Sequence, residues 1–396
     1  MVAETLPTPP ALPALRPALV AMTALQAVVA LGLFAPGVLA PRMGIDPAGL
    51  GLFTTAGFLV GMAASLGGGV MAGRLGAFRV ASLCALAVAA AMLLAMLGGN
   101  AAALLAAGVA IGLACGPETP ASSAILGRLA READRPFVFS LRQTGNQLGA
   151  MAGSVTLPAI AMAFDPRAGY AVIALVALGG ILLFERLRPV YDPLTRSAGT
   201  AFGLNAAWRL VRDDRALRRM ALASAPYAAT QIALNGFFVV FAVAELGIGH
   251  VAAGLALAVG QAGGLAGRLG WGVVATRWVA PRRLVGLLGL GMAAAAAFIG
   301  LAGASLPFPL LLVATFLLGL TASGWNGVFL AEIARLSPRD RIGEATGAVL
   351  VGSYAGLIGG PMLLIAASAF GGLATGYLLI AALAALAGLS LLGETR

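Results

Sequence analysis

The chain has 396 residues, of which 60% are apolar and only 10% charged, and its mean hydropathy is +0.97. Soluble globular proteins carry about 25% charged residues, so this composition excludes a water-soluble fold and indicates a polytopic helical membrane protein. The net charge of +10 would suggest a nucleic-acid partner in a soluble protein. Here all 25 basic residues are arginines whose placement follows membrane topology, so we expect lipids and no nucleic acid as partners.

The chain begins with a proline-rich, weakly acidic stretch, residues 1–16, which predicts a flexible cytoplasmic tail and not a cleaved signal peptide. Apolar runs follow, each of about the 20 residues that a membrane span needs. We predict twelve spans at 17–40, 50–68, 80–98, 101–126, 137–163, 168–187, 219–244, 249–271, 283–304, 307–333, 343–369 and 372–392. They divide into an N-terminal six-helix bundle (17–187), a cytoplasmic linker (188–218), a C-terminal six-helix bundle (219–392) and a short cytoplasmic tail (393–396).

The arginines orient these spans, because cytoplasmic loops are enriched in basic residues. With the N-terminus inside, 21 of the 25 arginines fall on the cytoplasmic side and 2 outside, while Arg142 and Arg268 lie within spans. We therefore expect both termini in the cytoplasm and the protein in the cytoplasmic (inner) membrane. The later part of the linker, 204–219, could form an amphipathic helix on the inner leaflet or remain a solvated connection.

The two halves of the chain resemble each other. Thr144-Gly145 in the fifth predicted span matches Thr346-Gly347 in the eleventh, and the glycines that follow also correspond (Gly149 and Gly153 with Gly352 and Gly356). Glycines of the fourth span, Gly112 and Gly116, similarly match Gly319 and Gly324 of the tenth. Such internal repeats are typical of transporters, which place the substrate site between the repeats near the middle of the membrane.

Two loops carry versions of one motif. The stretch "GVMAGRLGAFR" supplies Gly69, Arg74, Gly76 and Arg79, and "GVVATRWVAPR" supplies Gly272, Arg277 and Arg282, 203 residues later. The chain thereby resembles the major facilitator superfamily along almost its whole length. The resemblance implies two pseudo-symmetric six-helix bundles, alternating access to a central cavity, and a conformational role for these loops.

The loops depart from the family motif at one position each. Gly73 and Thr276 stand where the family carries an acid, which puts the usual charge lock between loop and helices in doubt. Arg74 and Arg277 are expected instead at helix C-termini, where cations are favourable.

Arg142 lies near the middle of the fifth span, where an arginine costs about 2.5–3.5 kcal/mol and needs a partner. Glu118 and Arg142 are each 12 residues from the loop centre near residue 130, so we expect them at the same depth on antiparallel neighbours. The pair could serve only to fix helix packing. Alternatively, protonation of Glu118 would release Arg142 for an anionic substrate and couple transport to a proton.

Arg268 is the second arginine within a span, one turn before Gly272. Its position resembles the eighth-span arginine of monocarboxylate transporters and of the oxalate–formate exchanger, which implies contact with a substrate carboxylate. These relatives pair it with other groups, and this chain has no lysine to supply one. Alternatively, Arg268 reaches the cytoplasmic surface along its own apolar stem.

Further polar residues within the spans could line a wet cavity. The seventh span contributes a stripe at i, i+4 and i+8, and the first, fifth and tenth spans contribute others. The substrate-binding candidates, besides the two arginines, are Gln26, Asn146, Tyr227, Gln231, Asn235, Trp325 and Asn326. Any one of them could instead make a hydrogen bond between helices, but as a convergent set they favour a cavity.

The sequence shows no metal cluster, nucleotide loop or nucleophile–base pair, so we expect neither an enzyme nor a bound cofactor. His250, the only histidine, is expected in an outer loop. The resulting hypothesis is a monomeric secondary transporter of a small organic or inorganic anion, working with protons or by exchange. The alternatives are proton-coupled efflux of lipophilic compounds and a membrane receptor or scaffold that does not transport.

Overall fold

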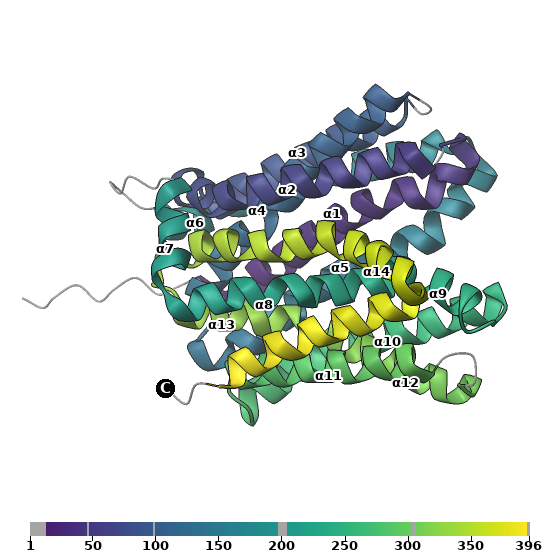
Figure 1. Ribbon diagram of the computed structural model, residues 1–396. Helices are drawn as coiled ribbons and strands as arrows, with labels where there is room; N and C mark the ends of the chain where they lie inside the picture. The colour runs from purple at the N-terminus through teal and green to yellow at the C-terminus, as the bar shows by residue number, and fades with distance from the viewer. Residues whose placement is uncertain (1–12, 46, 98–99, 197–203, 303–305, 394–396) are drawn as a thin grey trace, which may run out of the picture.

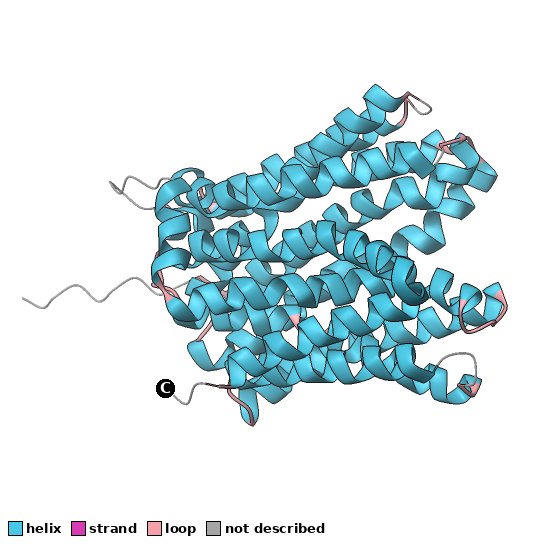
Figure 2. Cartoon of the chain, in the orientation of Figure 1, coloured by secondary structure: helices cyan, strands magenta, loops and turns pink. Residues whose placement is uncertain are grey.

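The structure is a computed structural model that describes residues 13–45, 47–97, 100–196, 204–302 and 306–393. Over these residues the chain is almost entirely helical and contains no strand (Figure 2). Residues 1–12 of the predicted tail (1–16), the linker stretch 197–203 and the last three residues lie outside the described residues.

Six helices precede the linker and agree with the first six predicted spans. They are α1 (Leu15–Met43), α2 (Pro47–Leu75), α3 (Ala77–Ala95), α4 (Ala101–Leu129), α5 (Arg135–Ala163) and α6 (Arg167–Thr195). A short helical turn, η1 (Glu132–Asp134), joins α4 to α5. Most of the helices are longer than the predicted spans, because the helical hydrogen bonding continues past the apolar run into polar residues.

The second half contains interrupted helices. They are α7 (Leu204–Asp213), α8 (Arg215–Ile232), the π-helical turn η2 (Ala233–Phe237), α9 (Phe238–Ala244), α10 (His250–Arg277), α11 (Pro281–Ala302), α12 (Phe308–Ala322), α13 (Asn326–Leu336) and α14 (Ile342–Leu392). The seventh predicted span is therefore α8, η2 and α9, and the tenth is α12 and α13. The last two predicted spans form the single element α14, whose backbone is non-helical at Gly371 and Gly372. Gly372 has φ 74°, which glycine adopts without strain.

Among the described residues, nine helices are long and apolar enough to cross a membrane by length and composition. Ile342–Leu392 counts once among them despite its break, and α5 and α10, which carry the two buried arginines, are not among the nine. The twelve-span count and the cytoplasmic location of both termini stay predictions.

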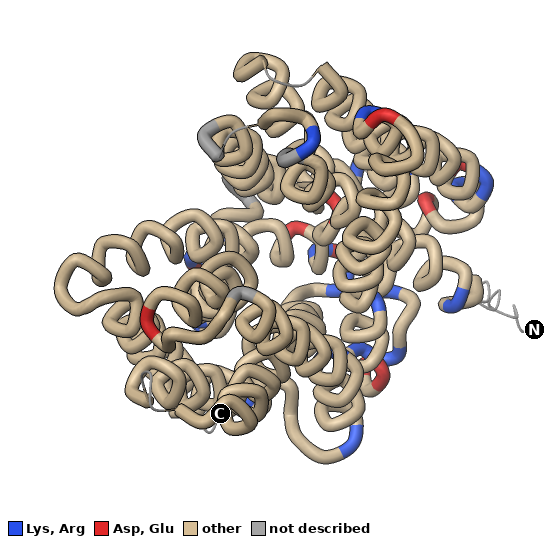
Figure 3. The backbone as a smooth tube through the Cα atoms, turned by 90° about the vertical axis from the view of Figure 1, so that its right-hand side faces the viewer, with Lys and Arg blue, Asp and Glu red and all other residues tan. Residues whose placement is uncertain are grey.

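The helices pack in two groups, α1 to α6 and α8 to α14. In Figure 1 the groups lie closest together at the left and diverge toward the right. An end-on view shows the same two groups and few charged residues along the helices (Figure 3). Within the first group α2 packs on α4 and α1 on α5, and within the second α10 packs on α12 and α8 on α14.

Glycines make these four helix pairs possible. A Cβ atom on Gly149 would clash with the Ala27 carbonyl of α1, and one on Gly352 would clash with the Ala221 carbonyl of α8. In the same way Gly112 of α4 lies against the Gly57 carbonyl of α2, and its match Gly319 of α12 lies against the Gly260 carbonyl of α10. Close contact through small residues is how membrane helices associate. The residues that match between the halves thus make equivalent contacts, which confirms the repeat.

The two groups contact each other at one end, which we call the arginine-rich end and which carries the loops near residues 76, 130, 280 and 338. Ser65 of α2 donates to the Gly347 carbonyl (3.1 Å). Arg135 donates to the carbonyls of Gly127 (2.8 Å) and Ala334 (3.2 Å), and so joins the C-terminal ends of α4 and α13. Because these ties lie at the predicted cytoplasmic side, the conformation is closed there.

The motif loops lie at this closed end. Gly69 packs against the backbone of Gly343 and Glu344 at the start of α14, and Gly272 packs against Ser140 of α5. Arg74 and Arg277 occupy the last turns of α2 and α10, as expected.

The acid missing from the first loop has a substitute on α6. Asp192 accepts hydrogen bonds from the backbone N–H groups of Phe78 (2.7 Å) and Arg79 (3.3 Å), and therefore caps the N-terminus of α3. Gly76, with φ 99°, lets the chain pass this carboxylate. Arg79 also pairs with Glu185 of α6 (3.0 Å).

Residues 188–195 of the predicted linker belong to α6 and 215–218 to α8, and the described part between these helices forms α7. Its residues Ala207 and Val211 are buried, and the helix contacts α2, α8 and α14. Its apolar face is therefore turned toward the helical groups, in contrast to the inner-leaflet helix considered from the sequence.

We predict that Gly327→Ala shifts the protein away from this conformation. A Cβ atom there would clash with the backbone of Ser140, 2.7 Å from its nitrogen. Overpacking costs about 1–3 kcal/mol, which would lower the population of the closed-end state roughly tenfold. Cys115 is partly exposed in this conformation, whereas Cys84 is buried. A smaller population of this conformation should therefore slow the labelling of Cys115 in intact cells by a membrane-impermeant methanethiosulfonate.

The matched control is Gly179→Ala, because nothing lies within 4 Å of a Cβ atom at Gly179. Equal labelling rates in the two variants would contradict the assigned role of the Gly327–Ser140 contact.

Candidate functional site

A cavity of about 230 Å³ lies between the two helical groups. Its lining comes from α1, α2, α4 and α5 on one side and from α8, η2, α13 and α14 on the other. Seven of the predicted site residues line it, namely Gln26, Glu118, Asn146, Gln231, Asn235, Trp325 and Asn326. The sequence pattern thus brings together polar side chains from five separate predicted spans.

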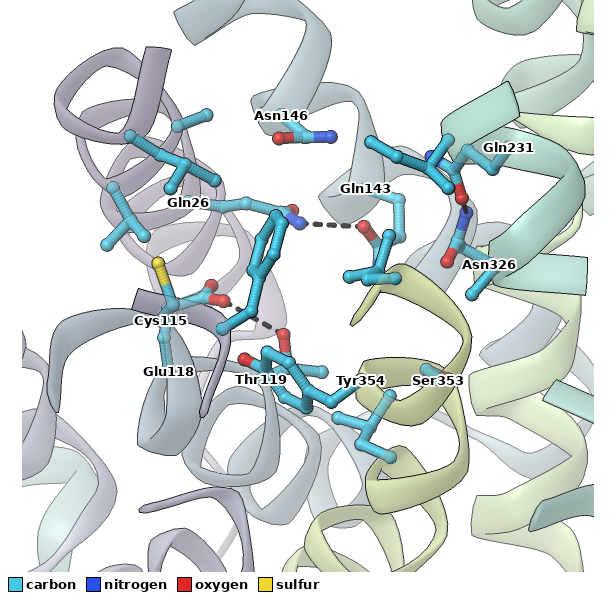
Figure 4. A pocket seen from close by; sticks show the side chains of 18 of the residues that line it. Gln26, Cys115, Glu118, Thr119, Gln143, Asn146, Gln231, Asn326, Ser353 and Tyr354 are labelled. Carbon is cyan, nitrogen blue, oxygen red and sulfur yellow. Dashed lines mark hydrogen bonds between the residues drawn. The ribbon is translucent and has the colours of Figure 1, made fainter. Parts of the chain in front are cut away.

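Glu118 and Arg142 are in contact, which confirms the pairing predicted from their equal distance to the loop. Arg142 Nη2 donates to Glu118 Oε1, and both terminal guanidinium nitrogens lie 3.3 Å from Thr119 Oγ1. Thr119 in turn donates to Glu118 Oε2 (2.8 Å) (Figure 4). Arg142 is 0% exposed and Glu118 is 3% exposed. Glu118 lines the cavity, and Arg142 lies behind it.

Arg268 is buried as well, with 1% of its surface exposed. Its Nη1 donates to the Gln143 carbonyl (3.0 Å) and lies 3.4 Å from Gln143 Oε1. Within the described residues it forms no ion pair with a carboxylate. Arg268 of α10 therefore reaches into the other helical group and does not extend to the cytoplasmic surface. Like Arg142, it does not line the cavity in this conformation.

Amide side chains connect the two groups beside the cavity. Gln147 of α5 donates to Gln261 of α10 (3.0 Å), and Gln261 donates to Asn235 (2.8 Å). Asn326 donates to Gln231 (3.3 Å), as Figure 4 shows. These bonds hold the carboxamides of both groups at defined positions around the cavity.

Tyr227 was expected to share a stripe with Gln231 and Asn235, and its position differs from that expectation. Its ring packs edge-on against Trp325 at 5.4 Å, and its hydroxyl donates to the Val285 carbonyl (3.1 Å). An α-helix turns 100° per residue, so positions i and i+8 differ by about 80°. Tyr227 therefore packs against the cavity-lining residue Trp325 and does not itself line the cavity.

Several lining residues were absent from the predicted site. They are Cys115, Thr119, Gln143, Ser353 and Tyr354, with further apolar residues. Thr119 and Gln143 directly follow Glu118 and Arg142 in the sequence, and this adjacency is the signal that marks them. Nothing in the sequence distinguishes Ser353 and Tyr354 from other polar residues of a membrane helix. In the described part of the chain no group of three potential metal ligands occurs.

Comparisons with known proteins agree with this architecture. The family model described as Major Facilitator Superfamily matches residues 18–306. No curated protein matches the chain.

Several solved structures share the fold. One is the outward conformation of FucP, the E. coli fucose:proton symporter (TM-score 0.75, 19% identity, 96% of this chain and 98% of that chain). Another is the human organic anion transporter MFSD10 (TM-score 0.77, 18% identity, 96% of this chain and 100% of that chain). A third is the proton:xylose symporter XylE bound to 6-bromo-6-deoxy-D-glucose (TM-score 0.73, 14% identity, 96% of this chain and 96% of that chain). At these identities the likeness shows the fold alone.

The buried ion pair gives a stability prediction. Glu118→Gln should destabilise the protein by about 3–5 kcal/mol, because it leaves a buried guanidinium without a counter-charge. Arg142→Gln should cost less, since the carboxyl left behind can bind a proton and lose its charge, whereas a guanidinium stays charged. Thermal unfolding of the detergent-purified variants measures this difference.

The double variant Glu118→Gln/Arg142→Gln should recover part of the loss, because no buried charge is then unpaired. Strictly additive losses in the double variant would mean that the two side chains do not interact.

Proposed function

The chain belongs to the Major Facilitator Superfamily and is a multi-pass membrane transporter, and we propose that it moves a small anion by alternating access of the cavity. The two moving bodies would be the six-helix bundles 17–187 and 219–392, joined by the linker 188–218. The proposal includes twelve spans, cytoplasmic termini, a location in the inner membrane and a monomeric state.

The observation that carries the anion proposal is the excess of positive charge behind the cavity lining. Glu118 neutralises one of the two buried arginines, and the described residues supply no carboxylate for the other, Arg268. A buried unpaired charge costs several kcal/mol. An anion in the cavity would reduce this cost, whereas a cation would increase it.

The geometry also supports proton coupling by Glu118. Its carboxylate is the group that occupies Arg142, and it lies at the cavity wall, where a proton from the cavity could reach it. Protonation alone would leave Arg142 without a counter-charge inside the protein. An anion bound at the same time would replace the lost carboxylate, so the proton and the anion should bind together. Binding together favours transport in the same direction, which is symport.

Two rival functions make different demands on the site. Efflux of lipophilic compounds would need a large apolar cavity with an unpaired Glu118, whereas Glu118 is paired with Arg142. A receptor or scaffold without transport would have its interior filled by side chains. Among the structures with this fold, MFSD10 is described as an organic anion transporter and the other two as proton symporters. Because identity to them is low, the proposal depends on the site residues.

We predict that anions stabilise the detergent-purified protein against thermal unfolding, and more strongly at lower pH. Binding takes up a proton, so the affinity should rise by up to about tenfold per pH unit lowered. An anion at about 100 times its dissociation constant should stabilise by about 2.7 kcal/mol. The probes are formate, propanoate, phosphate and sulfate, with tetraphenylphosphonium as the lipophilic cation.

Two variants serve as controls. Glu118→Gln should keep the stabilisation but lose its pH dependence, and Arg142→Gln should lose the stabilisation. Stabilisation by tetraphenylphosphonium alone would contradict anion transport and support efflux of lipophilic compounds.

A further inference from the structure

Three buried polar atoms of the cavity lining have no hydrogen-bond partner among the described residues. They are Gln26 Oε1, Trp325 Nε1 and Ser353 Oγ. All three side chains line the same cavity and belong to different elements: α1, the turn before α13, and α14. Each residue is at least nine-tenths buried. Such orphaned groups are rare in native proteins, and each requires an explanation.

The orientation of the Gln26 amide follows from Arg268. A guanidinium can only donate, and Arg268 Nη1 faces Gln143 Oε1 at 3.4 Å, so the oxygen of the Gln143 amide must point toward it. The Gln26 amide also bonds to Gln143 Oε1, and it must donate its Nε2–H there, at 2.6 Å (Figure 4). The Gln26 oxygen is thereby left as the free atom. Arg268 thus acts as a positioning residue that determines which atom of the Gln26 amide lacks a partner.

The other two atoms have defined requirements too. The indole Nε1–H of Trp325 can only donate, and the Ser353 hydroxyl can donate or accept. The ring of Trp325 is held by Tyr227 on one side and by Phe329 at 4.8 Å on the other. The donor is therefore fixed as firmly as the acceptor. A ligand that satisfies the lining must offer one acceptor to Trp325 and one donor to Gln26.

The cavity also limits the size of the ligand. Its volume of about 230 Å³ lies just below the range of about 300–1,000 Å³ that is usual for small-molecule sites. Sulfate and simple carboxylates are small enough but, when fully ionised, offer acceptors only. They would leave Gln26 Oε1 without a partner.

We propose that the substrate is a small hydroxycarboxylate, whose carboxylate accepts from Trp325 and whose hydroxyl donates to Gln26. The carboxylate part rests on the proposed anion transport, and the hydroxyl part rests on the orphaned acceptor. Ser353 can bond either group.

Protection of Cys115 from a methanethiosulfonate tests this inference, because Cys115 lines the cavity and Cys84 is buried. The probes form two matched pairs, glycerate with propanoate and gluconate with hexanoate, and glycerol is the neutral compound. For each anion we compare the concentration that halves the rate of Cys115 labelling. In at least one pair this concentration should be about tenfold or more lower for the hydroxylated anion than for its unhydroxylated partner.

Variants assign the preference to the named atoms. Gln26→Met removes the acceptor and should abolish most of the preference for the hydroxylated anion. Arg268→Met should also abolish the preference, by freeing the Gln143 amide to turn, and should weaken both anions because it removes the unpaired charge. Arg268→Lys, which also only donates, should retain the preference. Trp325→Phe should weaken both members of a pair alike. Ser123→Ala, at a buried unpaired hydroxyl outside the cavity lining, should change nothing.

Each contrary result has a separate meaning. Equal protection within both pairs overturns the hydroxyl assignment and leaves anion transport standing. Protection by glycerol and by no anion overturns anion transport and the carboxylate assignment with it. An unchanged preference in Gln26→Met and Arg268→Met overturns the role given to the oriented amides.

Discussion

The cost of a charge inside a membrane bundle is the constraint on which the rest of this structure depends. Two arginines are fully enclosed, and each must find hydrogen-bond acceptors. Arg142 finds a carboxylate on the neighbouring helix, whereas Arg268 crosses to the other helical group and donates to Gln143. The first arginine thereby keeps Glu118 at the cavity wall. The second ties the two groups together and orients the amides beside them.

The contacts between the groups explain why such ties can be broken. They consist of glycine and serine surfaces and of arginines that donate to carbonyls, as Arg135 does at the ends of α4 and α13. A hydrogen bond from a charged donor contributes only about 1.5–3 kcal/mol net, so a few such ties can be broken. Within each group, by contrast, glycines place whole helices in close contact along their length. Motion of two stiff bodies about a central cavity is the expected consequence.

Most of the fold could be predicted from the sequence, because apolar run length and arginine placement respond directly to the bilayer. The break at Gly371–Gly372, the π-helical turn and α7 depend on packing that no local pattern specifies. At the site, Glu118–Arg142 followed from helix geometry alone. Tyr227 does not line the cavity with Gln231 and Asn235, because positions i and i+8 of a helix point in directions about 80° apart. Ser353 and the amide orientation set by Arg268 appear only when both groups are assembled.

The most direct test of the account is whether an anion and a proton bind together. Binding of the most stabilising hydroxycarboxylate, glycerate or gluconate, is followed in weakly buffered solution with a pH indicator. We expect an uptake of about one proton per anion bound where Glu118 is ionised, and none in Glu118→Gln. Anion binding without proton uptake, or equal uptake in the variant, would contradict the coupling and leave exchange of anions as the mechanism.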